Sequence, residues 1–166
     1  YFSFDPATES FTVPFGDSAE IYSVNEAKDV KDCYWLRTKD ALYRKSKTGT
    51  ERFALPYALP LSTRVTLSPG NCCILFNELT KNILFFDYQT KQFSAPKILD
   101  RNGREDSSSV RDIVFIGDNF YLFTAQRLYR FDSATKSFVW HLDLKYRSNF
   151  NDDFLGSLPF NDTLIV

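Results

Sequence analysis

The amino-acid sequence predicts an all-β protein built from repeated four-stranded units, and three observations carry this prediction. Aromatic residues make up 17% of the 166 residues, with 17 Phe and 9 Tyr, and flat rings suit pleated, half-buried sheets. Short apolar runs alternate with turns along the whole chain. A turn pattern also returns about every 40 to 45 residues, and a fixed period of that length is typical of repeat architectures.

The repeated element is an eight-residue pattern, F-D-x-x-T-x-x-F. Its copies begin at Phe4, Phe86 and Phe131. A degenerate copy at 45–53 has one extra residue, and the closing phenylalanines are then Phe11, Phe53, Phe93 and Phe138. An Asp at the start of a turn accepts a hydrogen bond from the backbone N–H two residues on, and the Thr closes the far side. The pattern therefore predicts a hairpin between the third and fourth strands of each unit.

A second internal alignment supports the first. Residues 34–44 match residues 120–130 without gaps. The last complete unit contains four apolar runs, which predict four strands at 110–116, 120–124, 128–131 and 138–142. The alignments place Leu42 and Leu128 at equivalent buried positions, and they place Phe53, Phe93 and Phe138 at a second set of equivalent positions.

These units predict a β-propeller with blades of about 40–45 residues, because a four-stranded sheet of this size cannot bury both faces by itself. A β-sandwich is the alternative, but it does not predict so regular a period. We expect residues 1–166 to form a single propeller segment, with the following division: a partial blade at 1–19, blades at 20–58, 59–100 and 101–146, and a partial blade at 147–166. Since the chain starts and stops inside blades and has no Met, we expect a fragment of a larger propeller. A closed four-bladed ring is the alternative.

The composition excludes several classes of partner. With 20 Lys and Arg against 21 Asp and Glu, the net charge is −1, so the chain lacks the basic excess that binds nucleic acid or anionic membranes. No apolar run approaches the roughly 18 residues of a membrane helix, and we expect no membrane contact by this segment. The three cysteines, Cys33, Cys72 and Cys73, are expected to be buried thiols, with a disulfide from Cys33 to one of the others as the alternative.

Part of the sequence resembles the two-component regulator propeller repeat. The matching segments are IYSVNEAKD at 21–29, YWLRT at 34–38 and ALYR at 41–44, and residues 110–131 are a weaker second match. The sequence departs from the family pattern where glycine is expected, at Arg37, Ala41, Phe123 and Arg127. The resemblance implies the periplasmic sensor region of a Bacteroidetes hybrid two-component histidine kinase, an inner-membrane protein that detects oligosaccharides and works as a homodimer. In that family the propeller binds its ligand and does no chemistry.

Motifs for catalysis are missing from the sequence. It contains no phosphate-binding glycine loop, no zinc-protease motif and no nucleophile elbow. The single histidine, His141, lies in an apolar strand and is expected to be structural. We interpret Asp100–Asp106 as a solvated turn rather than a calcium loop, and the acidic pairs at 105–106 and 152–153 as solvated loop residues. The sequence therefore predicts no catalytic residue, no metal site and no cofactor.

Ligand contacts are expected from loops between blades and from turns between second and third strands, which gather on one face of a propeller. An oligosaccharide favours an aromatic ring surrounded by Arg, Asn and Asp side chains. We accordingly predict Tyr146, Arg147, Arg101 and Asn102 as ligand-binding residues. Two other functions stay open, namely an interaction scaffold without a small ligand and a propeller lyase or glycosidase.

Overall fold

The computed structural model describes residues 3–5, 10–12, 20–27, 30–69, 72–77, 79–144, 158–160 and 163–165. Within these residues every regular element is a strand, and no helix is present, so none could cross a membrane. The strands are β1 (Ser3–Asp5), β2 (Ser10–Thr12), β3 (Ser23–Glu26), β4 (Tyr34–Arg37), β5 (Ala41–Ser46), β6 (Gly49–Ala54), β7 (Thr63–Leu67), β8 (Cys73–Asn77), β9 (Ile83–Asp87), β10 (Gln92–Ser94), β11 (Ile98–Leu99), β12 (Val110–Ile116), β13 (Asn119–Thr124), β14 (Arg127–Asp132), β15 (Ser137–Asp143), β16 (Leu158–Phe160) and β17 (Thr163–Ile165).

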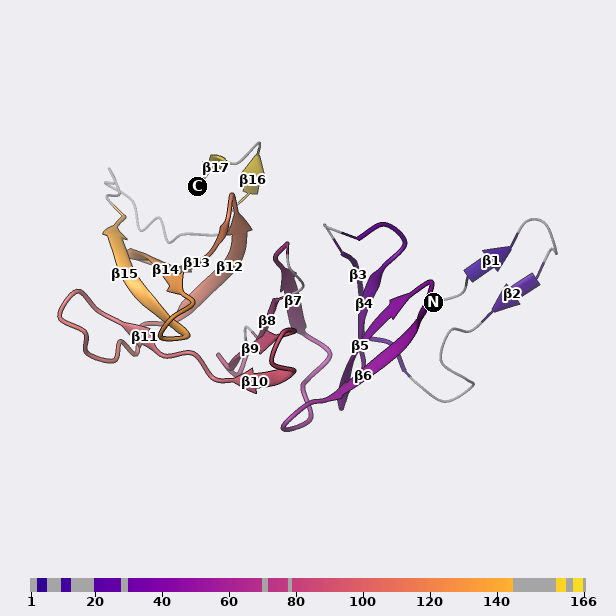
Figure 1. Ribbon diagram of the computed structural model, residues 1–166. Coiled ribbons are helices and arrows are strands. Elements are labelled where there is room, and N and C mark those ends of the chain that lie inside the picture. Colours follow the sequence, from indigo (N-terminus) through magenta and orange to yellow (C-terminus); the bar gives the residue numbers. More distant parts are fainter. Residues whose placement is uncertain are drawn as a thin grey trace. The chain divides into compact units, whose positions relative to one another are not determined.

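The strands form antiparallel meanders, as expected for propeller blades. One four-stranded sheet has the order β3-β4-β5-β6, a second has the order β10-β9-β8-β7, and a third has the order β11-β15-β14-β13-β12 (Figure 1). Two short hairpins, β1–β2 and β16–β17, complete the described strands. The chain divides into two compact units: the β3–β6 sheet belongs to the first, and the two sheets from β7 to β15 belong to the second.

The repeated phenylalanines are cross-strand partners. Phe86 pairs with Phe93 and Phe131 pairs with Phe138 in the antiparallel register, with ring centroids 4.6 and 5.3 Å apart. Phe4 and Phe11 are paired in the same way in the backbone. The pattern F-D-x-x-T-x-x-F therefore encodes one ring on each strand of a hairpin, which confirms the predicted connection between third and fourth strands.

The turns of these hairpins have the predicted chemistry. The Asp87 carboxylate accepts the backbone N–H of Gln89 at 2.9 Å, and Asp132 accepts that of Ala134 at 3.0 Å. The Thr135 hydroxyl donates to the other oxygen of Asp132 at 2.7 Å and closes the turn. Each Asp thus satisfies backbone donors that the turn would otherwise leave unpaired.

The degenerate copy at 45–53 was wrongly aligned. Its hairpin turns over only two residues, since Ser46 pairs directly with Gly49. Gly49 has a φ of +154°, which residues with a side chain rarely adopt. The shorter turn moves the register, so Phe53 lies opposite Leu42 and is not equivalent to Phe93 and Phe138.

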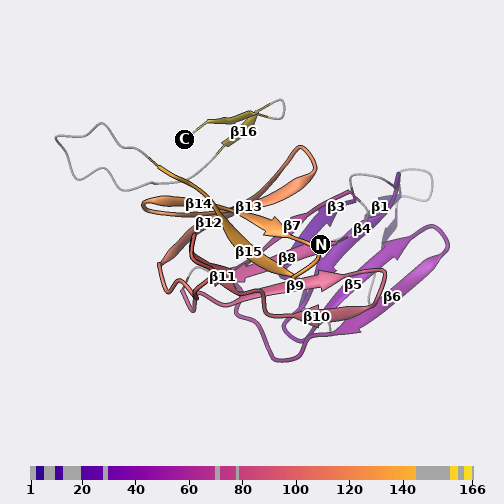
Figure 2. The same cartoon turned by 60° about the vertical axis from the view of Figure 1, so that its left-hand side comes forward.

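Two of the sheets have four strands, as expected for one repeat, but the third sheet has five. β11 adds to the edge of this sheet, parallel to β15, through the pairs Ile98↔Phe138 and Leu99↔Val139 (Figure 2). The backbone N–H of Phe138 donates to the carbonyl of Lys97 at 2.7 Å. The segment that leads into β12 therefore first covers the open edge of β15, which would otherwise expose unpaired backbone groups.

The predicted equivalence of Leu42 and Leu128 is confirmed. Leu42 pairs with Arg37 and Leu128 pairs with Phe123, at matching positions of their sheets, and their exposed fractions are 0% and 8%. The four strands predicted between residues 110 and 142 also match β12 to β15 within one or two residues. The division of the whole chain into blades stays a prediction.

The two sheets of the second unit share one core. The rings of Phe85 on β9 and Phe131 on β14 are in contact, with centroids 4.6 Å apart and planes tilted by 35°, within one cluster of buried residues from both sheets. The Thr66 hydroxyl donates to the carbonyl of Ile113 at 3.1 Å, and Lys81 donates to that of Val110 at 3.2 Å. Side-by-side packing of this kind gives each sheet the apolar partner it needs.

Candidate functional site

Two of the four predicted ligand-binding residues lie together in the structure. Arg101 and Asn102 line a polar pocket of about 240 Å³. The other lining residues are Asp100, Arg127, Trp140 and Asp143. Tyr146 and Arg147 lie outside the described residues. The six lining residues come from the loop after β11, from the start of β14 and from the end of β15, and we call this site the polar pocket.

Asp100 shapes the loop that carries Arg101 and Asn102. Its carboxylate accepts the backbone N–H groups of Asn102 at 2.8 Å and of Arg104 at 2.9 Å. Gly103 closes the turn with a φ of +74°, and its N–H donates to the carbonyl of Asp100 at 2.9 Å. The turn therefore fixes the backbone under Arg101 by local hydrogen bonds.

Trp140, Arg101 and Asp143 form the wall of the polar pocket. The indole N–H of Trp140 donates to Asp143 at 3.1 Å, and the guanidinium of Arg101 donates to the second oxygen of Asp143 at 2.8 Å. The same guanidinium lies 4.6 Å from the centre of the Trp140 ring. Cation–π attraction and the ion pair hold Arg101 against the sheet in one orientation.

Arg127 joins the polar pocket to a buried acid beneath it. Its guanidinium pairs with Asp106, and its Nε lies 3.8 Å from Asp143. Asp106 also accepts the hydroxyl of Tyr129 and the N–H of Ser108 at 2.8 Å, and only 8% of its side chain is exposed. Asp106 was expected to be solvated, and this expectation is wrong.

Electrostatics keep Asp106 ionised. Burial by itself opposes ionisation, but hydrogen bonds from Ser108, Tyr129 and Arg127 outweigh it and hold the pKa of the carboxyl well below its usual range. Burial and the negative Asp106 raise the pKa of Tyr129 to about 12. At neutral pH the group is therefore a carboxylate, a guanidinium and a neutral phenol.

The turn between β13 and β14 holds Arg127 in place. The Thr124 hydroxyl accepts the N–H of Arg127 at 3.0 Å, and the N–H of Leu144 donates to the carbonyl of Gln126 at 2.8 Å. The loop between blades and the turn between second and third strands thus meet at one end of the sheet, where ligand contacts were expected.

Sequence reasoning did not place Trp140 or Asp143 in a ligand site, whereas Arg127 lies in one of the turns between second and third strands from which contacts were expected. A signal for Trp140 was present, because the alternation in the strand 137–143 places it on the opposite face from Val139 and His141. His141 is exposed, and its ring contacts Tyr121 at a centroid distance of 5.8 Å. No comparable signal linked Asp106 to Arg127, since 21 residues separate them.

The polar pocket contains both hydrogen-bond donors and hydrogen-bond acceptors. Two guanidinium groups and an amide donate, while the two carboxylates and the amide oxygen accept. Such a set suits a polyhydroxylated molecule, whose hydroxyls both donate and accept. Among the residues that the structure describes, no group of three or more His, Cys, Asp or Glu side chains has the arrangement of a metal site.

Comparisons with known proteins support the fold. No family model matches the sequence, and no curated protein does. The structure resembles that of virginiamycin B lyase from Staphylococcus aureus, with 13% identity and a TM-score of 0.53 over 89% of this chain and 49% of the lyase. It also resembles the extracellular domain of a putative hybrid two component system from B. thetaiotaomicron, with 16% identity and a TM-score of 0.54 over 89% of this chain and 22% of that domain.

These likenesses confirm the all-β propeller fold. The chain spans about half the length of the lyase and about a fifth of the sensor domain.

Proposed function

We propose that this chain is a non-catalytic, ligand-sensing propeller segment in the periplasmic region of a membrane sensor histidine kinase, and that its ligand is an oligosaccharide. The observation that carries the proposal is the polar pocket, in which Trp140 is surrounded by Arg101, Asn102, Arg127 and Asp143. Its volume of about 240 Å³ is below the range of roughly 300–1,000 Å³ typical of sites that enclose a whole ligand. We therefore expect it to hold one unit of a longer chain.

The chemistry of the pocket favours sugar binding over turnover. Arg101 and Arg127 are tied to carboxylates, so their free N–H groups are preoriented for hydroxyl groups. Asp143 accepts hydrogen bonds from Arg101 and Trp140, and Asp106 accepts them from Arg127 and Tyr129. Both carboxylates are therefore engaged as acceptors rather than poised as acids. Binding without a reactive group supports an output that is conformational, in which the ligand shifts the receptor between two arrangements.

The sensor context rests on two further observations. The segments at 21–29, 34–38 and 41–44 resemble a repeat of sensor kinases, and the sensor domain from B. thetaiotaomicron shares the fold. In this proposal the receptor is a homodimer, and the kinase lies in another part of the protein. The lyase neighbour keeps a propeller enzyme as an alternative, and an interaction scaffold is the other.

The test is calorimetry on the whole extracellular region with a panel of glycan fragments. We expect one class of fragment to bind, and Arg101→Ala and Trp140→Ala to weaken that binding at least tenfold. The matched control is Lys91→Ala, which also removes a cation over an aromatic ring, that of Tyr88, but on the β9–β10 turn and outside the pocket.

Three results would contradict the proposal. Unchanged affinity in Arg101→Ala and Trp140→Ala, with a bound fragment present, removes the pocket from the site. Release of product from any fragment replaces sensing with catalysis. Failure of every fragment to bind, together with capture of a protein partner, favours the scaffold.

A further inference from the structure

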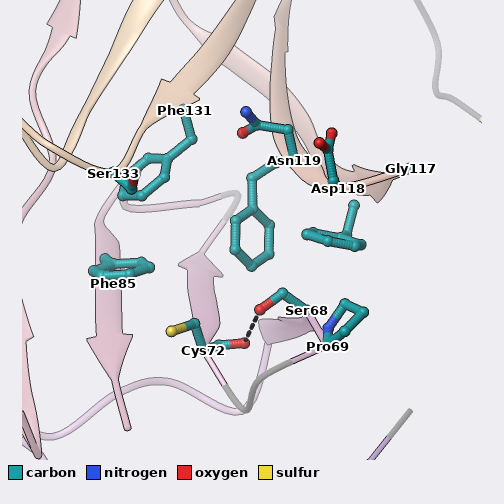
Figure 3. Close-up of a pocket in the computed structure, with 11 residues that line it drawn as sticks. Ser68, Pro69, Cys72, Phe85, Gly117, Asp118, Asn119, Phe131 and Ser133 are labelled. Carbon is teal, nitrogen blue, oxygen red and sulfur yellow. Dashed lines mark hydrogen bonds between the residues drawn. The ribbon is translucent and has the colours of Figure 1, made fainter. Parts of the chain in front are cut away.

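A second cavity lies at the other end of the β11–β15 sheet, where it also borders the β7–β10 sheet. It has a volume of about 350 Å³ and is entirely within the second unit. Ser68, Pro69 and Cys72 lie on one side, after β7 and before β8, and Asp118, Asn119 and Ser133 lie on the other (Figure 3). Because β14 begins at Arg127 and ends at Asp132, the polar pocket and this cavity are at opposite ends of one strand. We call it the aromatic cavity.

Four phenylalanine rings form its wall. The Phe85 and Phe131 rings are tilted by 35° with centroids 4.6 Å apart, Phe131 meets Phe120 edge-on at 6.1 Å, and Phe120 meets Phe115 edge-on at 4.9 Å. Three of these rings belong to the buried core, and Phe115 packs against it. The cavity is thus an opening onto the core whose wall is preformed by ring-to-ring contacts.

The size and lining of the cavity favour an apolar occupant. Its volume of about 350 Å³ lies within the range of roughly 300–1,000 Å³ typical of sites for small ligands. Water that lies against the four phenyl rings finds no hydrogen-bond partner on them. A planar ring that replaces this water gains apolar contact on faces and edges without rearranging the wall.

The charge at the rim selects among apolar ligands. Asp118 is the one charged residue among those described as lining the cavity. It is exposed, and no side chain in the described part of the chain donates to its carboxylate or pairs with it. A cationic group on the ligand would gain an ion pair there, whereas an anionic group would be repelled.

We infer that the aromatic cavity is a binding site for a small aromatic amine, with the ring against Phe85, Phe120 and Phe131 and the ammonium group at Asp118. The inference concerns a site separate from the polar pocket and does not depend on sugar binding.

Cys72 provides a built-in reporter for the test. It lines the cavity and is half-buried, whereas Cys33 and Cys73 are fully buried. Burial raises the pKa of the Cys72 thiol, so alkylation by iodoacetamide is measured at mildly alkaline pH, with peptide mapping to confirm the position. A ligand in the cavity should shield this sulfur from the reagent.

The experiment compares two probes with the same ring and opposite charge, 1-naphthylmethylamine and 1-naphthaleneacetate, on the whole chain. We expect the amine to slow alkylation of Cys72 in a saturable manner and to bind a few-fold more tightly than the acetate, the range of an exposed ion pair. Asp118→Asn should make the two affinities equal. Ser133→Trp, which fills the mouth from an exposed turn, should abolish amine binding measured by calorimetry.

Each other outcome overturns the inference. If neither probe protects Cys72 and neither gives heat on mixing, the cavity is not a ligand site. If both probes bind equally to the wild type, or if Asp118→Asn leaves the preference for the amine intact, the assignment to an amine is wrong. If Ser133→Trp melts like the wild type and still binds the amine, the ligand lies elsewhere. Loss of sugar binding in polar-pocket variants does not change the interpretation of any of these results, because they concern the aromatic cavity alone.

Discussion

Two turns at equivalent positions of the repeat share one hydrogen bond from a backbone N–H to a threonine, but they carry different side chains. In the first unit, Thr38 accepts the N–H of Ala41 at 3.1 Å. In the second unit, Thr124 accepts the N–H of Arg127 at 3.0 Å. A threonine hydroxyl thus shapes both turns between second and third strands, and the residue three positions later, alanine or arginine, decides what the turn can bind.

The two turns also use an equivalent tyrosine differently. Tyr43 accepts a hydrogen bond at 3.2 Å from Arg52, which pairs with Asp40 at 2.9 Å, and both charged side chains are about half exposed or more. Tyr129 is fully buried and donates to Asp106. The comparison teaches that the repeat supplies a common scaffold, while the acid that each turn meets is exposed at Asp40 and buried at Asp106.

The largest effect is expected at the leucines that follow the two turns. Leu42→Ala and Leu128→Ala should each lower the free energy of unfolding by about 2–5 kcal/mol, because each leaves a cavity in the core. The Leu42→Ala substitution should lower the free energy of unfolding more than Leu128→Ala, since Leu42 is fully buried and Leu128 is 8% exposed. Urea unfolding followed by fluorescence measures both, with Trp140→Phe and Trp35→Phe backgrounds to isolate the tryptophan of each unit. A cost near zero at either position would refute their equivalence.

The next largest effect on stability is expected at the buried Asp106, in contrast to the exposed Asp40. Asp106→Ala should lower the free energy of unfolding by about 1.5–3 kcal/mol, because it removes hydrogen bonds to a charged group. It leaves the buried Tyr129 hydroxyl without its acceptor and leaves Arg127 only the more distant carboxylate of Asp143. Asp40→Ala should change it far less, since its ion pair is exposed to solvent. Equal losses in the two variants, measured in the same urea titrations, would contradict the contrast between buried and exposed acids.

Lowering the pH should weaken the contribution of Asp106. Its pKa is depressed in the folded state, and in the unfolded chain an Asp has a pKa of about 3.9. The stabilisation is therefore complete above the unfolded value and is lost as the pH falls toward the folded one. We expect the difference in melting temperature between wild type and Asp106→Asn to shrink from about pH 6 to about pH 3. A difference that stays constant or widens would show that the ionised carboxylate is not the stabilising form.

The smallest effect should be the same in both turns. Thr38→Ala and Thr124→Ala each remove one buried hydroxyl that accepts a backbone N–H, and each should cost about 1 kcal/mol. Thr→Ser variants keep the hydroxyl and serve as controls in the same unfolding measurements. Costs that differ severalfold would mean that the two turns are not one structural element.

Much of the fold was predictable because its signals are local. The strands from 110 to 142 and the hairpins at Asp87 and Asp132 follow from apolar runs and turn residues within eight positions of each other. The same reasoning failed at 45–53, where Gly49 closes a two-residue turn and shifts the register of Phe53. A change of turn length is a local event, but its consequence is a different partner on the facing strand.

The predicted ligand-binding residues stay a prediction, and the contacts around two of them could not be read from the sequence. Arg101 and Asn102 lie in the polar pocket together with Trp140, and the contact between Arg101 and Asp143 joins residues 42 positions apart. Pairing of β11 with β15 brings these residues together, and nothing in either segment encodes that pairing by itself.

The sequence alone determined the all-β class, the period and the turns, because backbone hydrogen bonding and side-chain alternation act over a few residues. The tertiary structure decided which acid of Glu105 and Asp106 is buried, which rings border a cavity and which arginine meets Trp140. These outcomes depend on how separate strands pack, since burial and charge pairing are properties of groups brought together from distant positions in the chain.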